Sequence, residues 1–403
     1  MDKLTIRDFD AAGKRVFLRV DFNVPLADGK VTDDSRIRAS LPTINALLSQ
    51  GARVILASHL GRPDGKVQDG LRLRPVGERV SVLLRRNVPV TGDALGVGTE
   101  DAIKRLRAGE ALLLENLRFH AEEEKNDPAY AQTLASYADV FVNDAFGTAH
   151  RAHASTVGIA RLLPAYAGLL MEREIAMLSQ LVENPARPFA AILGGAKVSD
   201  KFKVLENLIS KVDILVVGGG MANTFLLAQG KSVGKSLAEH DRVDDARRIL
   251  AAAEARGVPV ILPTDVVIAK EVTRGTEYKT VGTEKFPASW HIVDIGEASR
   301  AAIEQALMPA KTVFWNGPLG VFEIPSFAHG TKAIARFLAD RAEQGTIVVV
   351  GGGDSLAAIE QQGLTSKMTH ISTGGGASLE FLEGKELPGI AVLLDRPRVE
   401  AKT

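Results

Sequence analysis

The sequence predicts an α/β protein built from two doubly wound, parallel-sheet (Rossmann-like) domains joined by a hinge helix. Short β-rich apolar runs alternate with amphipathic stretches through both halves of the chain, which is typical of βαβ units. The 403 residues exceed what one hydrophobic core usually supports, so two domains are expected. In the second half, three apolar runs each lead into a triple glycine and then a predicted helix.

In the first half, four apolar runs are long enough for buried strands, and amphipathic stretches between them fit helices. The expected strands are 15–20, 53–57, 111–114 and 139–142. The expected helices are 36–49, 75–85 and 129–137.

The second half repeats this alternation with five apolar runs. The expected strands are 189–193, 214–217, 258–262, 312–315 and 347–350, and the expected helices are 198–209, 244–256 and 331–343. Between the halves, residues 168–183 carry apolar side chains at helical spacing and are stopped by Asn184-Pro185 and Pro188. We therefore expect domains at 1–170 and 185–387, with a hinge at 171–184.

Composition excludes several classes of function. Lysine plus arginine and aspartate plus glutamate both number 49, so no overall field attracts nucleic acid or a membrane surface, and an anion site has to be local. The absence of cysteine excludes disulfides and thiolate chemistry. The N-terminal residues show no signal-peptide pattern and no apolar run reaches membrane-spanning length, so a cytoplasmic soluble protein is expected.

The triple glycines predict phosphate binding. Glycine lets backbone N–H groups approach an anion, and the following helix offers unpaired N-terminal donors. The three segments are ILVVGGGMANTF (214–225), TIVVVGGGDSLAA (346–358) and HISTGGGASLEF (370–381), and a further pair, Gly194-Gly195, precedes Lys197 and Lys201. Neither a Walker A loop nor a Gly-x-Gly-x-x-Gly dinucleotide motif is satisfied, which argues against a P-loop or nicotinamide enzyme.

Arginine and histidine recur in the loops after the strands of the first half. The segments are 19–25, 58–63, 115–120 and 150–153, and Arg36 opens a helix. Carboxyl ends of parallel strands share one sheet edge, so guanidinium groups there could converge on a phosphate or carboxylate. Any one arginine is more simply a solvated residue or half of an Arg–Asp pair. Their recurrence after successive strands favours an anion site.

Nine motifs resemble the phosphoglycerate kinase family in order and approximate spacing, over nearly the whole chain. They are RVDFNVP, SHLGRP, ENLRFH, NDAFGTAHRAHAST, GGAKVSDK, VVGGGMANTF, WNGPLGVFE, GGGDS and STGGGASLE. The resemblance implies reversible phosphoryl transfer between 1,3-bisphosphoglycerate and ADP, giving 3-phosphoglycerate and ATP, with Mg²⁺ on the nucleotide. It also implies domain closure, a monomer, and a C-terminal tail (388–403) that packs back on the first domain.

The resemblance also implies residue roles in the first domain. Asp21 and Asn23 match residues that hold the glycerate, and His59, Arg62, Arg118 and Arg151 match those that grip its non-transferred phosphate. Phe22, Leu60 and Gly61 belong to the same substrate-binding segments. Arg36, Lys197, Gly374 and Gly375 match groups that face the transferring phosphoryl group, with Gly376 beside them.

In the second domain, the implied nucleotide-binding residues include glycines, a lysine and two carboxylates. They are Gly194, Gly195, Lys201, Gly219, Gly220, Asn316, Pro318, Val321, Glu323, Gly352, Gly353, Asp354 and Ser355. Glu323 matches the ribose-binding carboxylate, and Asp354 matches the one that positions magnesium. Lys197 and Lys201 are both expected at the start of a helix.

Simpler interpretations stay open for several residues. Asp354 and Ser355 also suit helix caps, and Glu323 suits a solvated carboxylate. His120, His150 and His153 are expected to be structural, and the run 122–125 to be an exposed charged segment. Arg74 and Glu297 depart from the family pattern, which leaves local loop shape open.

Two other functions compete with this one. A two-lobed protein that binds a phosphorylated metabolite without catalysis would also close on its ligand. Another acyl-phosphate or carboxylate kinase would use a different acceptor.

Overall fold

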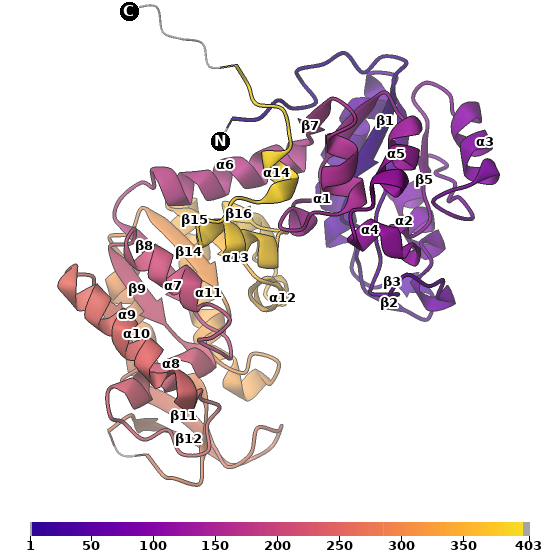
Figure 1. Ribbon diagram of the computed structural model, residues 1–403. Helices are drawn as coiled ribbons and strands as arrows, with labels where there is room; N and C mark the ends of the chain where they lie inside the picture. The colour runs from indigo at the N-terminus through magenta and orange to yellow at the C-terminus, as the bar shows by residue number, and fades with distance from the viewer. Residues whose placement is uncertain (1, 285, 398–403) are drawn as a thin grey trace, which may run out of the picture. The chain divides into compact units, whose positions relative to one another are not determined.

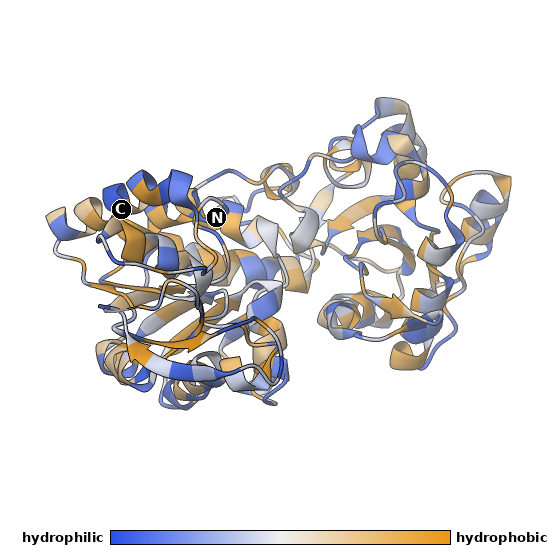
Figure 2. Cartoon of the chain, turned by 90° about the horizontal axis from the view of Figure 1, so that it is seen from below, coloured by the Kyte–Doolittle hydropathy of each residue, from blue (hydrophilic) through white to orange (hydrophobic). Residues whose placement is uncertain are grey.

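The computed structural model describes residues 2–284 and 286–397. The chain folds into two compact units (Figure 1). Unit 1 takes its residues from 1–176 and 386–403, and unit 2 is the continuous run 177–385. In the hydropathy view, the strands of the parallel sheets are among the most hydrophobic segments (Figure 2). Within the described residues, no helix combines the length and the apolar character needed to span a bilayer.

Unit 1 contains a five-stranded sheet in which all neighbouring strands are parallel, in the order β5-β4-β1-β6-β7. The strands are β1 (Arg15–Arg19), β4 (Arg53–Ala57), β5 (Ala111–Leu113), β6 (Val140–Asn143) and β7 (Ala165–Ala167). The chain first builds outward from β1 on one side and then on the other, so the topology switches between β1 and β6. Ligands of such sheets bind at the carboxyl ends next to the switch.

Helices and a small hairpin complete unit 1. They are β2 (Leu26–Ala27), β3 (Lys30–Val31), α1 (Ser35–Ser49), α2 (Arg74–Leu84), α3 (Val97–Arg105), α4 (Ala121–Glu124), α5 (Pro128–Ser136) and α14 (Pro388–Ala391). The central strand β1 is buried on both faces, with Val16 and Leu18 in the core on one side and Phe17 against Phe141 on the other. This explains its uninterrupted apolar run.

Unit 2 contains a six-stranded parallel sheet in the order β10-β9-β8-β14-β15-β16. The strands are β8 (Phe189–Leu193), β9 (Ile214–Val217), β10 (Val260–Ile261), β14 (Thr312–Asn316), β15 (Ile347–Gly351) and β16 (His370–Ile371). The helices are α7 (Phe202–Ile209), α8 (Gly219–Ala228), α9 (Val243–Ala255), α10 (Glu297–Leu307), α11 (His329–Glu343), α12 (Gly353–Glu360) and α13 (Gly376–Leu382). The switch lies between β8 and β14.

All three predicted strand–glycine–helix units are confirmed, since β9, β15 and β16 lead into α8, α12 and α13. The predicted two-domain α/β fold is therefore confirmed as well. A second, antiparallel sheet, β12-β11-β13, was not expected. It consists of β11 (Asp265–Ala269), β12 (Tyr278–Gly282) and β13 (His291–Ile295).

Two predicted elements of unit 2 are wrong in their bounds. The strand expected at 258–262 shrinks to β10, because Pro259 and Pro263 flank it and lack a backbone donor. The helix expected from 198 begins only at Phe202. Ser199 donates from its backbone N to Glu239 (3.0 Å) and from its hydroxyl to the same carboxylate, which holds residues 198–201 in a turn.

Helix α6 (Leu169–Glu183) forms where the hinge helix was expected, beginning in unit 1 and ending in unit 2. The buried Asp144 caps its first turn, since Oδ1 accepts hydrogen bonds from Leu170 N (2.9 Å) and Met171 N (3.1 Å). The C-terminal segment returns to unit 1 through Asn143 Nδ2 to Gly389 O (3.0 Å). The predicted tail is described as far as 397, and its residues 398–403 lie outside the described part.

Candidate active site

The arginine-bearing loops of unit 1 meet at the carboxyl ends of its strands, as the topology requires. Asn23, after β1, accepts a hydrogen bond at Oδ1 from Gly61 N (2.9 Å), after β4. Arg118, after β5, donates from Nη1 to Gly61 O (2.9 Å). Gly61 has φ +62°, and a Cβ there would lie 2.7 Å from the Leu71 side chain, so this junction favours glycine.

Several of these cations are paired with carboxylates. Arg36 Nη1 lies 2.6 Å from Asp21 Oδ2, and Arg118 Nε lies 3.2 Å from Glu124 Oε1. The Arg–Asp pairing that we considered as the simpler alternative is thus present at Arg36. The Arg36 side chain is still 38% exposed, and the five donors of its guanidinium group exceed what one carboxylate occupies.

The other predicted substrate residues differ in how they are placed. Arg62 is exposed beside Gly61, and Arg151 is half-buried with Nε donating to His150 Nε2 (3.1 Å). Phe22 and Leu60 are buried, so their side chains serve the core. The electrostatic influence of Arg151 on Arg118, and of Arg36 and Arg118 on His59, shows that these side chains share one region.

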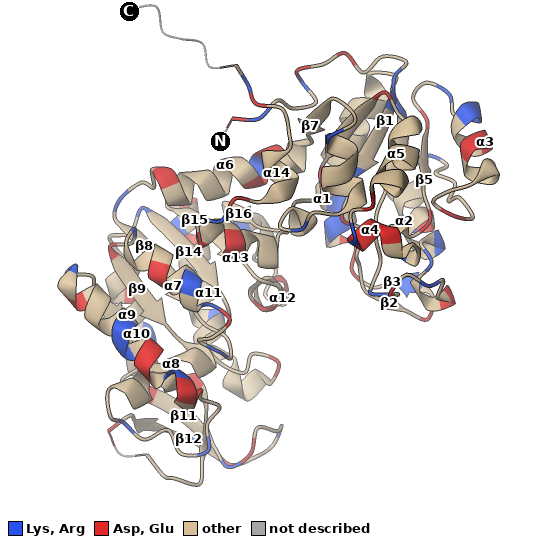
Figure 3. Ribbon diagram, viewed as in Figure 1, with Lys and Arg blue, Asp and Glu red and all other residues tan. Residues whose placement is uncertain are grey.

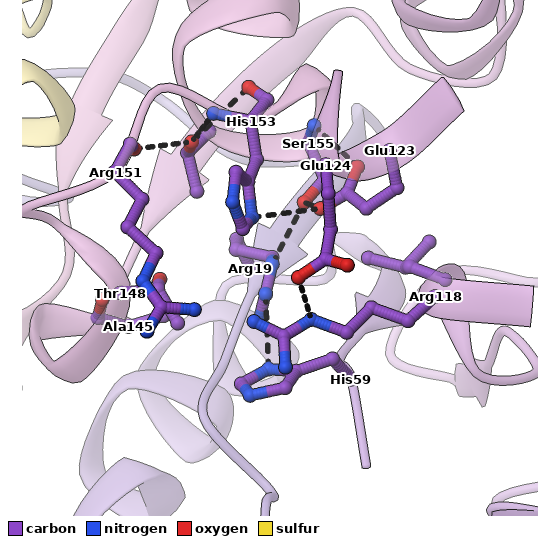
Figure 4. A network of polar contacts seen from close by, with 12 residues as sticks. Arg19, His59, Arg118, Glu123, Glu124, Ala145, Thr148, Arg151, His153 and Ser155 are labelled. Carbon is purple, nitrogen blue, oxygen red and sulfur yellow. Dashed lines mark hydrogen bonds and ion pairs between the residues drawn. The ribbon is translucent and has the colours of Figure 1, made fainter. Parts of the chain in front are cut away.

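A buried polar network lies beneath this surface (Figure 4). Arg19, fully buried at the end of β1, donates from Nε to Ser155 Oγ (2.9 Å), and its Nη2 lies 3.2 Å from His59 Nδ1. Ser155 in turn donates to Glu123, from Oγ to Oε1 (2.5 Å) and from N to Oε2 (2.9 Å). The expectation that 122–125 is an exposed charged segment is therefore wrong for Glu123, which is fully buried.

The histidines of this network are neutral. Burial, reinforced by the guanidinium groups of Arg19 and Arg118, holds the pKa of His59 well below its usual range. The same causes lower the pKa of His153 to about 3. His153 also forms a capping box with Thr156, which supports the structural role expected for it.

Unit 2 contains a cavity of about 520 Å³ at its topological switch. Its walls come from the loops after β8, β9 and β14, from the antiparallel sheet and from the start of α12. Of the predicted nucleotide residues, the walls include Gly195, Gly219, Gly220, Pro318, Val321, Glu323 and Asp354. They also include residues that the sequence did not single out, such as Lys235, Leu237, Asp294 and Leu319.

Glycine is required where the loops after β8 and β14 cross. Gly194 N donates to Asn316 O (2.9 Å), and Gly195 N donates to Pro318 O (2.9 Å). A Cβ on Gly194 would lie 2.2 Å from Pro318 O, a separation that no real contact shows. Gly194 thus acts by allowing two backbones to approach, and Gly195 forms part of the wall.

The two lysines of this loop differ in environment. Lys197 is exposed in the loop itself, four residues after β8, and the expectation that it starts a helix is wrong. Lys201 directly precedes α7, and its Nζ donates to Gly194 O (2.6 Å) and Asn316 O (3.2 Å). Burial lowers the pKa of Lys201 to about 8, although Asp354 partly opposes this shift.

Asp354 and Ser355, the neighbouring residues at the start of α12 that we expected to bind the nucleotide, differ in their exposure. Asp354 is exposed in the first turn, and the N-cap position belongs to Gly352, which has φ +90°. Ser355 is buried, and its Oγ accepts a hydrogen bond from Gly317 N (2.6 Å). Gly375, with φ +51°, precedes α13, and a Cβ there would meet open space.

Sequence reasoning missed Arg19, Glu123 and Ser155 as members of the buried network beneath the arginine-bearing loops of unit 1. A signal was available for Arg19, because a charge in the last position of an apolar central strand needs a buried counter-charge. Nothing in a run of three glutamates tells which one turns inward.

The family model for phosphoglycerate kinase matches residues 6–385. The phosphoglycerate kinases of Pelotomaculum thermopropionicum and Moorella thermoacetica are each 56% identical to this chain over 396 residues, covering 98% of it and their own full length. The solved phosphoglycerate kinase structures from Coxiella burnetii and Pyrococcus horikoshii match with TM-scores of 0.87 and 0.86, at 43% and 37% identity. Each match covers 97% of this chain and 98% of the other. The chain belongs to the phosphoglycerate kinase family.

Proposed function

We propose that this kinase, which transfers a phosphoryl group reversibly between 1,3-bisphosphoglycerate and ADP in glycolysis, divides its substrates between the two units. The acid binds at the arginine-lined strand ends of unit 1, and the nucleotide binds in the cavity of unit 2. Two observations support this proposal: arginine-bearing loops meet at the carboxyl ends of the sheet of unit 1, and a cavity of about 520 Å³ lies at the topological switch of unit 2. The sites also differ in chemistry, since guanidinium groups gather in one and backbone amides and apolar walls in the other.

Phosphoryl transfer requires positioning and positive charge more than proton transfer. The carboxylate of 3-phosphoglycerate is already ionised at neutral pH, so a general base is unnecessary. We assign the glycerate to Asp21 and Asn23, and its resting phosphate to His59, Arg62, Arg118 and Arg151. Arg36, Lys197 and the amides around Gly374 and Gly375 are assigned to the moving phosphoryl group.

On the nucleotide side, Gly195, Gly219 and Gly220 provide a flat wall for the base, and Glu323 accepts hydrogen bonds from the ribose. Lys201 and the segment 352–355 face the phosphates. The wall residues Pro318 and Val321, with Asn316 behind them, complete the pocket. Each assignment matches a residue type to the chemistry of the group that it contacts.

The carboxylate of Asp354 fits a magnesium ion that arrives with the nucleotide. Within residues 2–284 and 286–397, no group of three or more His, Cys, Asp or Glu side chains is arranged to hold a metal. Mg²⁺ commonly uses one or two carboxylates together with substrate phosphates and waters, and Asp354 is exposed at the cavity wall. When bound, the ion would supply positive charge to the phosphate oxygens.

Transfer needs donor and acceptor within bonding distance in a space that excludes water, so we propose that the units close on their substrates about α6. Small-angle scattering should show a smaller radius of gyration with both substrates than with either alone. An unchanged radius would argue against closure. We further propose that the protein is a monomer, because one chain supplies both sites, and sedimentation in the presence of substrates would test this. We also propose that it is cytoplasmic.

The division of substrates predicts that binding defects separate by unit. Arg118→Ala should weaken 3-phosphoglycerate binding by about 10-fold or more, the loss expected for a hydrogen bond to a charged group, and leave ATP binding unchanged. Glu323→Ala should weaken ATP binding and leave 3-phosphoglycerate binding unchanged. Calorimetric titration of each ligand into each variant measures this. Loss of both ligands from one variant would contradict the division, and a coupled assay with other carboxylate acceptors would test the choice of acid.

Lys201 predicts a pH dependence of nucleotide binding. Its pKa of about 8 in the free protein means that it loses its proton as pH rises through 8, and bound phosphate favours the charged form. Between pH 8 and 9, the dissociation constant of ATP should therefore rise by up to about tenfold, with proton uptake on binding. Lys201→Met should bind ATP weakly and without this slope. If the dissociation constant of ATP for wild type did not change from pH 7.5 to 9, the phosphate-binding role of Lys201 would be contradicted.

A further inference from the structure

Helix α4 carries three consecutive glutamates and is red in the view coloured by charge (Figure 3). The environments of the three side chains differ sharply. Glu122 is exposed, Glu123 is fully buried, and Glu124 lies beside Arg118. A buried carboxylate is costly unless it is paired and hydrogen-bonded, so the position of Glu123 calls for a partner of opposite charge. That partner is Arg19, which is also fully buried and is reached through Ser155.

The direction of the hydrogen bonds that Arg19 makes in this network is fixed by chemistry. A guanidinium group only donates, so the contact of Arg19 Nε makes Ser155 Oγ an acceptor. The single hydroxyl proton of Ser155 is then free to go to Glu123 Oε1. Glu123 Oε2 accepts from Ser155 N, so both oxygens of Glu123 are hydrogen-bonded to Ser155. Burial raises the pKa of Glu123, and the charge of Arg19 together with these hydrogen bonds opposes that shift and favours the carboxylate.

Because a guanidinium group only donates hydrogen bonds, its contact with His59 also fixes which ring nitrogen accepts. Arg19 Nη2 lies 3.2 Å from His59 Nδ1, and because Arg19 has no acceptor, Nδ1 has to be the unprotonated ring nitrogen. The environment keeps His59 neutral, so its one ring proton sits on Nε2. An Nε2–H group donates to a phosphate oxygen, whereas the opposite tautomer would face it with a lone pair.

We propose that Glu123 is a positioning residue for the acid site: through Ser155 it holds Arg19 in place, and Arg19 fixes His59 in the tautomer that donates from Nε2. This inference rests on the proposed binding of 3-phosphoglycerate in unit 1. Arg19 is a buried support in this arrangement, and it does not contact the substrate.

The test uses the full-length protein, labelled with ¹⁵N in its histidines, and compares wild type, Glu123→Gln and Arg19→Lys. Glu122→Gln is the matched control, because it removes the same charge from the exposed face of the same helix. The imidazole ¹⁵N shifts of His59, assigned with His59→Gln, report the tautomer in the absence of ligand. Steady-state kinetics give KM for 3-phosphoglycerate and for ATP separately.

In wild type and in Glu122→Gln, we expect a protonated Nε2 and an unprotonated Nδ1. Glu123→Gln and Arg19→Lys should shift His59 toward a mixture of tautomers and raise KM for 3-phosphoglycerate by about 10-fold or more. KM for ATP should stay within about twofold, since a general loss of structure would move both. Ser155→Ala, which keeps both charges and removes only the bridging hydroxyl, replaces any variant that fails to fold and should behave like Glu123→Gln.

An Nδ1-protonated His59 in wild type would overturn the proposal. Unchanged His59 shifts and an unchanged acid KM in Glu123→Gln, matching Glu122→Gln, would overturn it as well. Failure of the substrate assignment would look different. Adding 3-phosphoglycerate would then leave the His59 resonances of wild type unchanged, while ligand-free His59 would still be protonated on Nε2.

Discussion

Replacing Lys197 with alanine is expected to lower turnover by about 10²- to 10³-fold, the loss typical when one preorganised charge is removed from a transition state. Lys197 is exposed in the glycine loop after β8, next to the cavity wall at Gly195, and α7 begins only at Phe202. Its ammonium group therefore contributes little to packing. The KM values should change less than kcat, because the charge on the moving phosphoryl group is greatest during transfer.

The matched control is Lys203→Ala, which removes an exposed lysine from α7. It should retain near-wild-type turnover, and both variants should unfold at the wild-type temperature. If Lys197→Ala kept wild-type kcat, its role in transfer would be wrong. If both variants lost activity alike, the effect would belong to the charge of the whole loop.

The second large effect concerns stability. Arg19→Met should lower the free energy of unfolding of unit 1 by about 3–5 kcal/mol, because it leaves Glu123 as an uncompensated buried carboxylate. Both tryptophans, Trp290 and Trp315, lie in unit 2, so their fluorescence follows that unit during denaturation. Hydrogen exchange of the β1 amides follows unit 1. We expect Arg19→Met to lower the exchange protection of the β1 amides and to leave the denaturation curve followed by tryptophan fluorescence nearly unchanged.

Two further variants distinguish the buried charge from simple loss of volume. Arg53→Met, on the neighbouring strand β4, removes a half-buried arginine that donates to Gly13 O (2.7 Å), and should cost less than about 1 kcal/mol. The double variant Arg19→Met/Glu123→Met should recover part of the loss, since it removes both charges. Equal destabilisation in the single and double variants would contradict the ion-pair explanation.

The architecture was predictable because its strands are buried on both faces. Such strands read as unbroken apolar runs, and the triple glycines mark where three of them end. Strand β12 (Tyr278–Gly282) escaped because most of its residues are exposed and polar, so neither an apolar run nor a clean alternation identifies it. The late start of α7 escaped because it depends on Glu239, some 40 residues further on.

The candidate site was predictable to the extent that motifs recur at strand ends. Gly219 and Glu323 could be named from such motifs, but Asp294 lines the same cavity from a strand of the unexpected antiparallel sheet. Burial raises the pKa of Asp294 to about 7, although backbone donors from Gly330 and Ile295 oppose the shift. No local pattern separates that aspartate from a solvated one, because its environment is assembled by tertiary contacts.

The return of residues 386–397 to unit 1 affects how the protein is made. Synthesis proceeds from the N-terminus, so the segment that contributes Gly389 O to Asn143 and Leu394 O to Leu4 leaves the ribosome after all of unit 2. Unit 2 is one uninterrupted stretch of the chain, so its contacts depend on no later segment. Unit 1, although translated first, has to wait for a later part of the same polypeptide before its own contacts are complete.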